Sequence, residues 1–317
     1  MVRAYLIRRL LQVVPVLFGV SLLVFGMMVL IPGDPARAIL GSYATPENVA
    51  ALEADLALDR PVHEQYISWI TNVAQGDFGR SYSLNRPVFD EITERFTATL
   101  LLAGTALIIV VLLGLTAGIV AAVKQHKWQD RAFTIGALVG LSMPSFWLGL
   151  IFIVVFALNL GWFPTSGMRS AFGGGGPLDI AHHLILPATA LALVASGVIA
   201  RITRSNMLEV LRADYVRTAQ SKGLANRWVV MRHAFRNAIV AIVPVIGVQI
   251  GFLLGGAVYI ETVFGWPGIG RMLVNAIGTR DILLVQGGVL LVATSYVLIN
   301  LAADIVQAIL DPRIRVE

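Results

Sequence analysis

The sequence contains no cysteine and few charged residues for its length. Without cysteine the chain cannot form a disulfide, a thiol nucleophile or a cysteine metal site, and its redox compartment is left open. Charged residues make up 14% of the chain, against about 25% in soluble domains, whereas hydrophobic residues make up 57%. This composition predicts a protein that resides in a membrane.

Charge is also absent from six long apolar runs. Each run has about 17 residues or more, enough for a helix to cross a hydrocarbon core of about 30 Å. Helices are the expected form, because lipid makes unpaired backbone groups costly and the runs lack the alternation of barrel strands. We therefore predict an all-α polytopic membrane protein with six transmembrane helices. The runs are Leu10–Leu30, Leu100–Val123, Ala132–Leu160, Leu184–Ala200, Ala238–Ile260 and Leu283–Ala303.

The distribution of basic residues predicts the orientation in the membrane. Two thirds of the 24 lysines and arginines fall at the two termini, near residues 124–131, and between the fourth and fifth runs. All these segments share one side if both termini are cytoplasmic, which is the side that basic loops favour. The net charge of +5 is a sum over opposite faces, so it gives no support to nucleic-acid binding.

We expect one transmembrane domain over residues 1–317, with an extracytoplasmic helical insertion at 31–99 and a cytoplasmic loop at 201–237. In the insertion, Thr45 can cap one helix, and Pro61 can open a second. The first apolar run is too long for a signal-peptide core and no cleavage site follows it, so we expect an uncleaved anchor.

The chain lacks the signatures of ATP binding and of membrane-embedded chemistry. The glycine run Phe172–Gly176 is interpreted as a flexible loop, because no strand precedes it and no Gly-Lys-Ser/Thr follows it. The apolar runs hold no carboxylate or histidine to bind a coupling ion. The neighbouring His182 and His183 would point about 100° apart on a helix, so they would make a poor metal chelate. The prolines and glycines in the runs are compatible with close helix packing and also with the lining of a translocation path.

One polar strip, DYVRTAQSKGLANRWVVMRHAFRNA, lies between two of the apolar runs. Its pattern predicts a single helix from Leu208 to Ser221, ended by Gly223, and a second helix capped by Asn226 that continues into the fifth run. Such a basic amphipathic projection suits either anionic lipid headgroups or a docking partner.

The strip resembles the EAA loop of ABC importer permeases, in which Arg217-Thr218-Ala219 and Gly223 hold the positions of Glu-Ala-Ala and the following glycine. The Arg-Thr-Ala form is similar to that of dipeptide and oligopeptide importers, although Ala57 stands where that subgroup usually has glycine. Further stretches resemble this subgroup: IPGDPA, LALDRPVHEQYISWI, GDFGRS, SMPSFWLG, RSNMLEVLRADYVRTAQSKGL and ETVFGWPGIG.

The resemblance implies a multi-pass permease subunit of a bacterial-type inner membrane, with no catalytic residue, cofactor or metal of its own. Its partners would be a second homologous permease, two cytoplasmic ATPases that bind ATP and Mg, an extracytoplasmic substrate-binding protein and membrane lipid. The residues implied for ATPase coupling are Tyr215, Arg217, Thr218, Ala219, Gly223 and Leu224, and those for contact with solute or binding protein at the outer mouth are Glu261, Phe264, Trp266 and Pro267.

The same resemblance implies dipeptides or short oligopeptides as solutes. Related permeases for nickel complexes, glutathione or haem are alternatives, as is an ion-coupled secondary carrier. A membrane-bound enzyme is not expected, because no catalytic set of side chains occurs on the spans.

Overall fold

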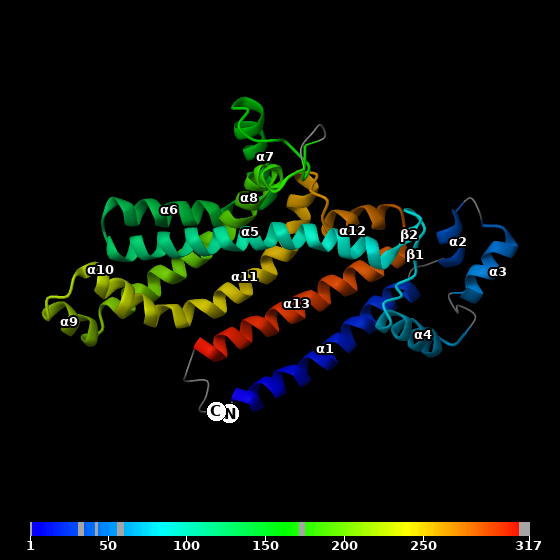
Figure 1. Cartoon of the computed structure of the whole chain (residues 1–317), viewed down its shortest axis with the longest axis horizontal. Helices are drawn as coiled ribbons and strands as arrows, with labels where there is room; N and C mark the ends of the chain where they lie inside the picture. Colours follow the sequence, from blue (N-terminus) through cyan, green and yellow to red (C-terminus); the bar gives the residue numbers. More distant parts are fainter. Residues whose placement is uncertain (1, 31–34, 42–43, 56–59, 171–174, 311–317) are drawn as a thin grey trace. The chain divides into compact units, whose positions relative to one another are not determined.

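The computed structural model describes residues 2–30, 35–41, 44–55, 60–170 and 175–310. Their regular structure is helical apart from one short hairpin, and turns and loops connect the elements (Figure 1). The motif residues 31–34 and 56–59 and the glycines at 173–174 lie outside the described residues. The elements are α1 (Val2–Leu30), α2 (Pro35–Leu40), α3 (Pro46–Asp55), α4 (Val62–Ala74), β1 (Arg80–Ser81), β2 (Arg86–Pro87), α5 (Val88–Val123), α6 (Trp128–Ser142), α7 (Ser145–Phe152), the π-helical η2 (Ile153–Asn159), α8 (Pro177–Leu211), α9 (Asp214–Ser221), α10 (Asn226–Trp228), the π-helical η3 (Val229–Phe235), α11 (Arg236–Val263), α12 (Ile269–Gly278) and α13 (Ile282–Leu310).

The chain divides into two compact units. The first unit comprises residues 1–6, 99–267 and 299–317, and the second comprises residues 7–98 and 268–298. The helices α5 and α13 run from one unit into the other.

Among the residues that the structure describes, five helices are long and apolar enough to cross a membrane, and a bent pair supplies a sixth span if it is counted as one. The all-α prediction is confirmed, but the third apolar run is not one helix. It is divided into α6 and the α7–η2 segment, whose axes differ by 105°. The five long spans are Arg8–Met27, Val88–Val123, Pro177–Leu211, Asn226–Val263 and Ile282–Gln307.

The break in the third run has a local cause at Pro144. Met143 and Pro144 both have extended backbone, with ψ of 130° and 137°. Proline has no N–H to continue the helical ladder, and its ring disfavours helical backbone in the residue before it. By contrast, Pro187 and Pro244 lie inside the continuous helices α8 and α11.

Helix α8 is the centre of the first unit, and small residues let its neighbours approach closely. A Cβ at Gly118 of α5 would come within 2.6 Å of the Ala200 carbonyl oxygen, and a Cβ at Gly197 of α8 within 2.7 Å of the Ala137 carbonyl oxygen. Membrane helices associate mainly through such close packing, since lipid is as apolar as the side chains. The helices α5, α6 and α8 therefore form a tight group.

The second unit is built on α1, α4, α12 and the first half of α13. The side chains of Tyr66 and Trp69 on α4 pack against Phe25 of α1, and the Tyr66 hydroxyl lies 2.7 Å from Ser21 Oγ. Tyr66 and Trp69 are therefore the residues through which the helix after Pro61 contacts α1. A separate core joins α5, α12 and α13 through Val88, Ile92, Ile269, Met272, Ala276, Leu283 and Leu284.

The insertion contains the predicted helices with revised boundaries. Thr45 Oγ1 accepts a hydrogen bond of 3.2 Å from the Asn48 N–H, so the predicted cap of α3 is confirmed. The loop expected to run to residue 99 ends earlier, because α5 already begins at Val88. The amphipathic residues 88–99 extend the span beyond its apolar run, which hydropathy alone does not reveal.

The carboxylate of Asp281 holds the β1–β2 hairpin. Its Oδ2 accepts hydrogen bonds from Ser81 Oγ at 2.6 Å and from Ser83 Oγ at 2.7 Å, while its Oδ1 accepts one from the Leu284 N–H at 3.2 Å. One buried side chain thus caps the start of α13 and fixes a hairpin 200 residues away in the sequence.

Candidate coupling site and transport cavity

The polar strip folds as two helices on the first unit, not as the single helix predicted before Gly223. Helix α8 ends at Leu211, and Ala213 has extended backbone with φ −68° and ψ 145°. Helix α9 then begins at Asp214. No proline or glycine marks this break, so helix propensity alone could not locate it.

Helix α9 is anchored by its own inner face. Val216 is fully buried and Ala219 is 7% exposed, and both pack with Val229 of η3. Partly buried Val210 and Leu211 at the end of α8 complete this small core. Among the residues predicted for coupling, Ala219 is therefore buried within the chain, where it packs α9 against η3.

The outward side of the same strip carries the other predicted residues. Tyr215 is 47% exposed and Leu224 is 41% exposed. The Arg217 side chain is 69% exposed, and its Nη1 lies 3.9 Å from a fully exposed Asp214 carboxylate, an ion pair that contributes little in water. Thr218 is exposed too, with its hydroxyl donating to the Asp214 carbonyl at 2.9 Å. The strip thus offers both apolar and charged surface.

Gly223 ends the projection in the way that the sequence predicts. Its φ is +75°, the left-handed conformation that glycine adopts at little cost, and its N–H donates to the Gln220 carbonyl at 2.9 Å. A Cβ placed on Gly223 would meet nothing within 4 Å. The requirement for glycine within this chain is therefore conformational, and the space beside it is open.

The start of the next helix differs from the prediction. Ala225, not Asn226, is the residue before α10, and Asn226 is already helical. The continuation into the fifth span is confirmed, because Asn226–Val263 forms one long apolar helix. Sequence reasoning also missed Trp228, which is 52% exposed and carries the Arg232 guanidinium 5.3 Å from its ring centroid.

An ion pair that the sequence did not reveal joins α6 to α8. Arg204 Nε lies 2.7 Å from Asp130 Oδ1, and Arg204 Nη2 lies 2.9 Å from Asp130 Oδ2. The same carboxylate accepts a hydrogen bond from the His126 N–H in the turn before α6. The Asp130 side chain is 7% exposed, so this two-bond pair is largely shielded from water.

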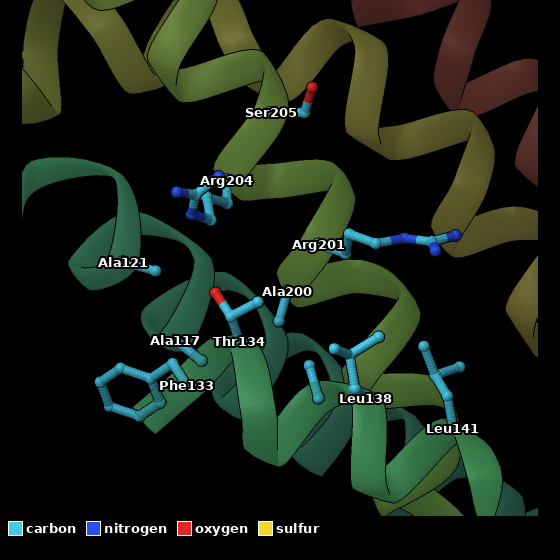
Figure 2. Close-up of a pocket in the computed structure, with 11 residues that line it drawn as sticks. Ala117, Ala121, Phe133, Thr134, Leu138, Leu141, Ala200, Arg201, Arg204 and Ser205 are labelled. Atoms are coloured by element: carbon cyan, nitrogen blue, oxygen red, sulfur yellow. The ribbon is translucent and has the colours of Figure 1, made fainter. Parts of the chain in front are cut away.

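Next to this pair, α5, α6 and α8 enclose a cavity of about 220 Å³. Figure 2 shows Arg204 on the opposite side of α8 from the extended Arg201 side chain, with Thr134 of α6 below it. The ion pair is thus a direct side-chain connection between α6 and α8 beside this cavity. The lining residues are Ala117, Ala121, Phe133, Thr134, Ala137, Leu138, Leu141, Ala200, Arg201, Arg204 and Ser205.

A larger cavity of about 480 Å³ lies where the α6–α7 break meets α8 and α11, and we call it the transport cavity after the role that we propose for it. Its walls are mainly apolar, and no charged residue among those that the structure describes lines it. Its volume is within the range of small-molecule sites, about 300–1,000 Å³. The lining residues are Leu141, Ser142, Met143, Pro144, Ser145, Leu191, Val194, Ala195, Val198, Gln249, Phe252, Leu253 and Gly256.

The residues predicted at the outer mouth are mostly turned into the protein. Glu261 and Trp266 are fully buried and Phe264 is 2% exposed, whereas Pro267 is partly buried. Thr99 Oγ1 donates to Glu261 Oε1 at 2.5 Å. A contact of these side chains with solute requires this segment to open, so their role stays a prediction.

Within the part of the chain that the structure describes, no three His, Cys, Asp or Glu side chains come together as metal ligands. The two neighbouring histidines have other partners. His182 Nε2 lies 2.9 Å from the Trp162 carbonyl oxygen, and His183 Nδ1 lies 2.9 Å from the Asp179 carbonyl oxygen. One ring nitrogen of each histidine is therefore paired with a backbone carbonyl oxygen.

Comparison with known proteins matches nearly the whole chain. Residues 114–316 match the family described as binding-protein-dependent transport system inner membrane component, and residues 1–103 match the N-terminal part of such membrane components. The glutathione transport system permease protein GsiC of Escherichia coli (strain K12) is 43% identical over 311 residues, covering 98% of each chain. The protein of the same name from Salmonella typhi has the same identity and coverage.

A solved structure has a similar fold. An inward-facing MetNI methionine ABC transporter chain matches 69% of this chain and 96% of its own length, with a TM-score of 0.55 and 16% sequence identity. The ATPase subunits and the binding protein of such transporters are separate components, and the subunit in the membrane is not itself catalytic. The chain therefore belongs to the binding-protein-dependent inner membrane components, and it is the permease subunit of an ABC importer.

Proposed function

We propose that this permease forms the translocation path for dipeptides or short oligopeptides. The observation that carries the proposal is its relationship to permeases named for glutathione, which is itself a short peptide. The resemblance of six sequence stretches to dipeptide and oligopeptide permeases supports the same class. Glutathione is accordingly the second candidate solute, ahead of nickel complexes and haem.

The transport cavity is compatible with this class of solute. Peptides share a neutral, hydrogen-bonding backbone but differ in side-chain charge and size. A charged wall would retain some peptides and repel others, whereas a mainly apolar wall with few polar groups favours neither. In an ABC importer, selection of the solute can be left to the binding protein.

For energy coupling, we propose that the exposed side of α9 and its turn, formed by Tyr215, Arg217, Thr218, Gly223 and Leu224, docks into a cytoplasmic ATPase. The inner core under α9 supports this role, because a lever must be packed rigidly against the helices it moves. The ATPases would bind ATP and Mg, so the permease needs neither. A second homologous permease would complete the path.

We further propose that both termini and α9 are cytoplasmic. Two of the predicted cytoplasmic segments, the turn at 124–127 and α9, lie at the same end of the first unit in Figure 1. In this orientation the β1–β2 hairpin and the 261–267 segment would lie outside, where a binding protein delivers solute. Glu261, Phe264, Trp266 and Pro267 would reach it only after this segment opens.

The test is uptake by the complete complex in vesicles loaded with ATP. The permease is reconstituted with its co-purifying subunits and binding protein, and uptake of a labelled dipeptide is compared with that of labelled glutathione. The controls replace ATP by a non-hydrolysable analogue or omit the binding protein. We expect ATP-dependent uptake of peptide. If an ATP-hydrolysing complex takes up neither peptide, the proposed solute class is wrong.

A further inference from the structure

A buried glutamine lies on the wall of the transport cavity. Gln249 is near the middle of α11, in the membrane-spanning segment Asn226–Val263, and is 6% exposed. It lines the cavity together with apolar side chains of α8 and α11. A glutamine within a membrane helix usually hydrogen-bonds to a neighbouring helix, so a glutamine without such a bond requires another explanation.

The side-chain amide of Gln249 has no hydrogen-bond partner among the residues that the structure describes. The Gln249 amide is accessible from the cavity, unlike Thr203 Oγ1 and Gln129 Oε1 of the same unit, which are fully enclosed and have no partner. A group that enters the cavity or adjoins it can therefore pair with the amide, whereas a leucine at this position would offer no hydrogen bond.

We propose that Gln249 is a solute-contacting residue of the translocation path and that its amide hydrogen-bonds to the peptide groups of the passing solute. This inference rests on the proposed function. A primary amide has two donors and an acceptor, so it can match the N–H and C=O of a peptide bond. Because it is neutral, it can contact peptides whatever their side-chain charge and need not hold them tightly.

The other polar groups of the cavity are less suited to this contact. Ser142 Oγ already donates to the Leu138 carbonyl at 2.9 Å. Ser145 lies in the first turn of α7, beside the break at Pro144. No lysine, arginine, aspartate or glutamate that the structure describes lines the cavity. Ser145 offers one hydroxyl, whereas Gln249 offers an amide with two donor hydrogens and an acceptor oxygen.

The test compares Gln249→Leu with a matched control, Gln286→Leu. Gln286 is also a buried glutamine of a spanning helix. Its Nε2 donates to the Val24 carbonyl at 3.4 Å, its Oε1 is enclosed without a partner, and it does not line the transport cavity. In the reconstituted complex with ATP inside the vesicles, we expect Gln249→Leu to lower peptide uptake per ATP hydrolysed by about 3- to 10-fold, the effect of one lost neutral hydrogen bond. Gln286→Leu should leave this ratio unchanged.

A second variant gives a readout that a purely structural role would not move. Gln249→Glu places a carboxylate on the cavity wall, so it should favour cationic over anionic peptides. We expect the ratio of Ala-Lys uptake to Ala-Glu uptake to rise at least about 3-fold over the native ratio, while peptide affinities of the separate binding protein stay the same.

Three results would overturn the inference. The first is native uptake per ATP in Gln249→Leu together with a native Ala-Lys to Ala-Glu ratio in Gln249→Glu. The second is loss of the second permease subunit from the purified Gln249→Leu complex, because Gln249 would then pair across the subunit interface. The third is absence of ATP-driven peptide uptake by the native complex, which overturns the proposed function itself and is visible before any variant is made.

Discussion

The guanidinium of Arg204 on α8 and the carboxylate of Asp130 on α6 face each other through two hydrogen bonds of 2.7 and 2.9 Å. Seventy-four residues of sequence separate them. They join two helices next to a cavity, in the part of the first unit from which α8 leads on to α9. The ion pair therefore joins α6 to the part of α8 that leads on to α9.

Breaking this pair on one side should destabilise the permease. Asp130→Asn leaves Arg204 without its counter-charge, and Arg204→Gln leaves the largely buried Asp130 carboxylate unpaired. We expect each to lower the free energy of unfolding by about 1–2 kcal/mol, less than for a fully buried pair because the Arg204 side chain is 30% exposed. Thermal unfolding of the detergent-purified permease measures this. The double variant should be more stable than the sum of the single effects predicts, and simple additivity would show that the two residues do not interact.

Substitution of Gly223 can separate the effect of its backbone conformation from the effect of a side chain that projects into the proposed ATPase contact. Asparagine adopts the left-handed conformation more readily than most residues, whereas valine does so only with strain. Neither side chain would clash within the chain, because the space beside Gly223 is open. We expect both Gly223→Asn and Gly223→Val to insert normally and to uncouple ATP hydrolysis from uptake, since both place atoms in the proposed ATPase contact. The measurement is uptake per ATP hydrolysed. Native coupling in Gly223→Asn would mean that only the backbone conformation matters.

The carboxylate of Asp281 anchors the β1–β2 hairpin to the start of α13. In Asp281→Asn one side-chain oxygen is replaced by an NH₂ group, which donates and cannot accept. The single remaining oxygen cannot accept all three hydrogen bonds, from the Ser81 and Ser83 hydroxyls and from the Leu284 N–H. We expect amide hydrogen exchange of residues 80–87 to speed up at least about tenfold, while exchange in α8 is unchanged. Ser83→Ala, which removes one of these donors, should have a smaller effect. Unchanged hairpin exchange in Asp281→Asn would contradict the anchoring role.

The sequence predicted those parts of the structure that depend on local pattern. Apolar runs located the spans, and the glycine of a left-handed turn located the end of α9 at Gly223. Thr45 followed by proline located the start of α3. Each of these depends on a few neighbouring residues, so one sequence is enough to find them.

The features that sequence reasoning missed depend on tertiary contacts. In the sequence Asp130 follows a basic turn and resembles an ordinary surface residue. Its partner Arg204 is distant in the sequence and lies beside it only in the folded chain. The break at Ala213 separates two segments that both favour helix, and beyond it Val216 packs against Val229, a contact between residues that the local pattern does not relate. Gln249 is the one case with a signal in the sequence, since it is a polar side chain within the apolar run Ala238–Ile260. That signal identifies the residue but not the cavity that it lines.

The absence of cysteine makes the orientation directly testable. Leu84→Cys places a single thiol on the exposed hairpin, and Lys222→Cys places one on the exposed turn after α9. If the termini and α9 are cytoplasmic, a membrane-impermeant maleimide added to intact cells with a permeable outer membrane should label the Leu84→Cys variant only. Both variants should label after the cells are lysed, and the native chain should never label. The reverse pattern would invert the proposed topology.

Two glycines on the same helix should respond in opposite ways to alanine. A Cβ at Gly118 of α5 would lie 2.5 Å from Thr203 Cβ and 2.6 Å from the Ala200 carbonyl oxygen, so α5 and α8 would have to separate. A Cβ at Gly104, also on α5, would meet nothing within 4 Å. We expect Gly118→Ala to lower the free energy of unfolding by about 1–3 kcal/mol, as overpacking does. Gly104→Ala should not lower it and can raise it by up to about 1 kcal/mol, because alanine favours helix. Thermal unfolding of the purified permease distinguishes them, and an equal loss of stability in both would show that helix flexibility, not close packing with α8, is what these glycines supply.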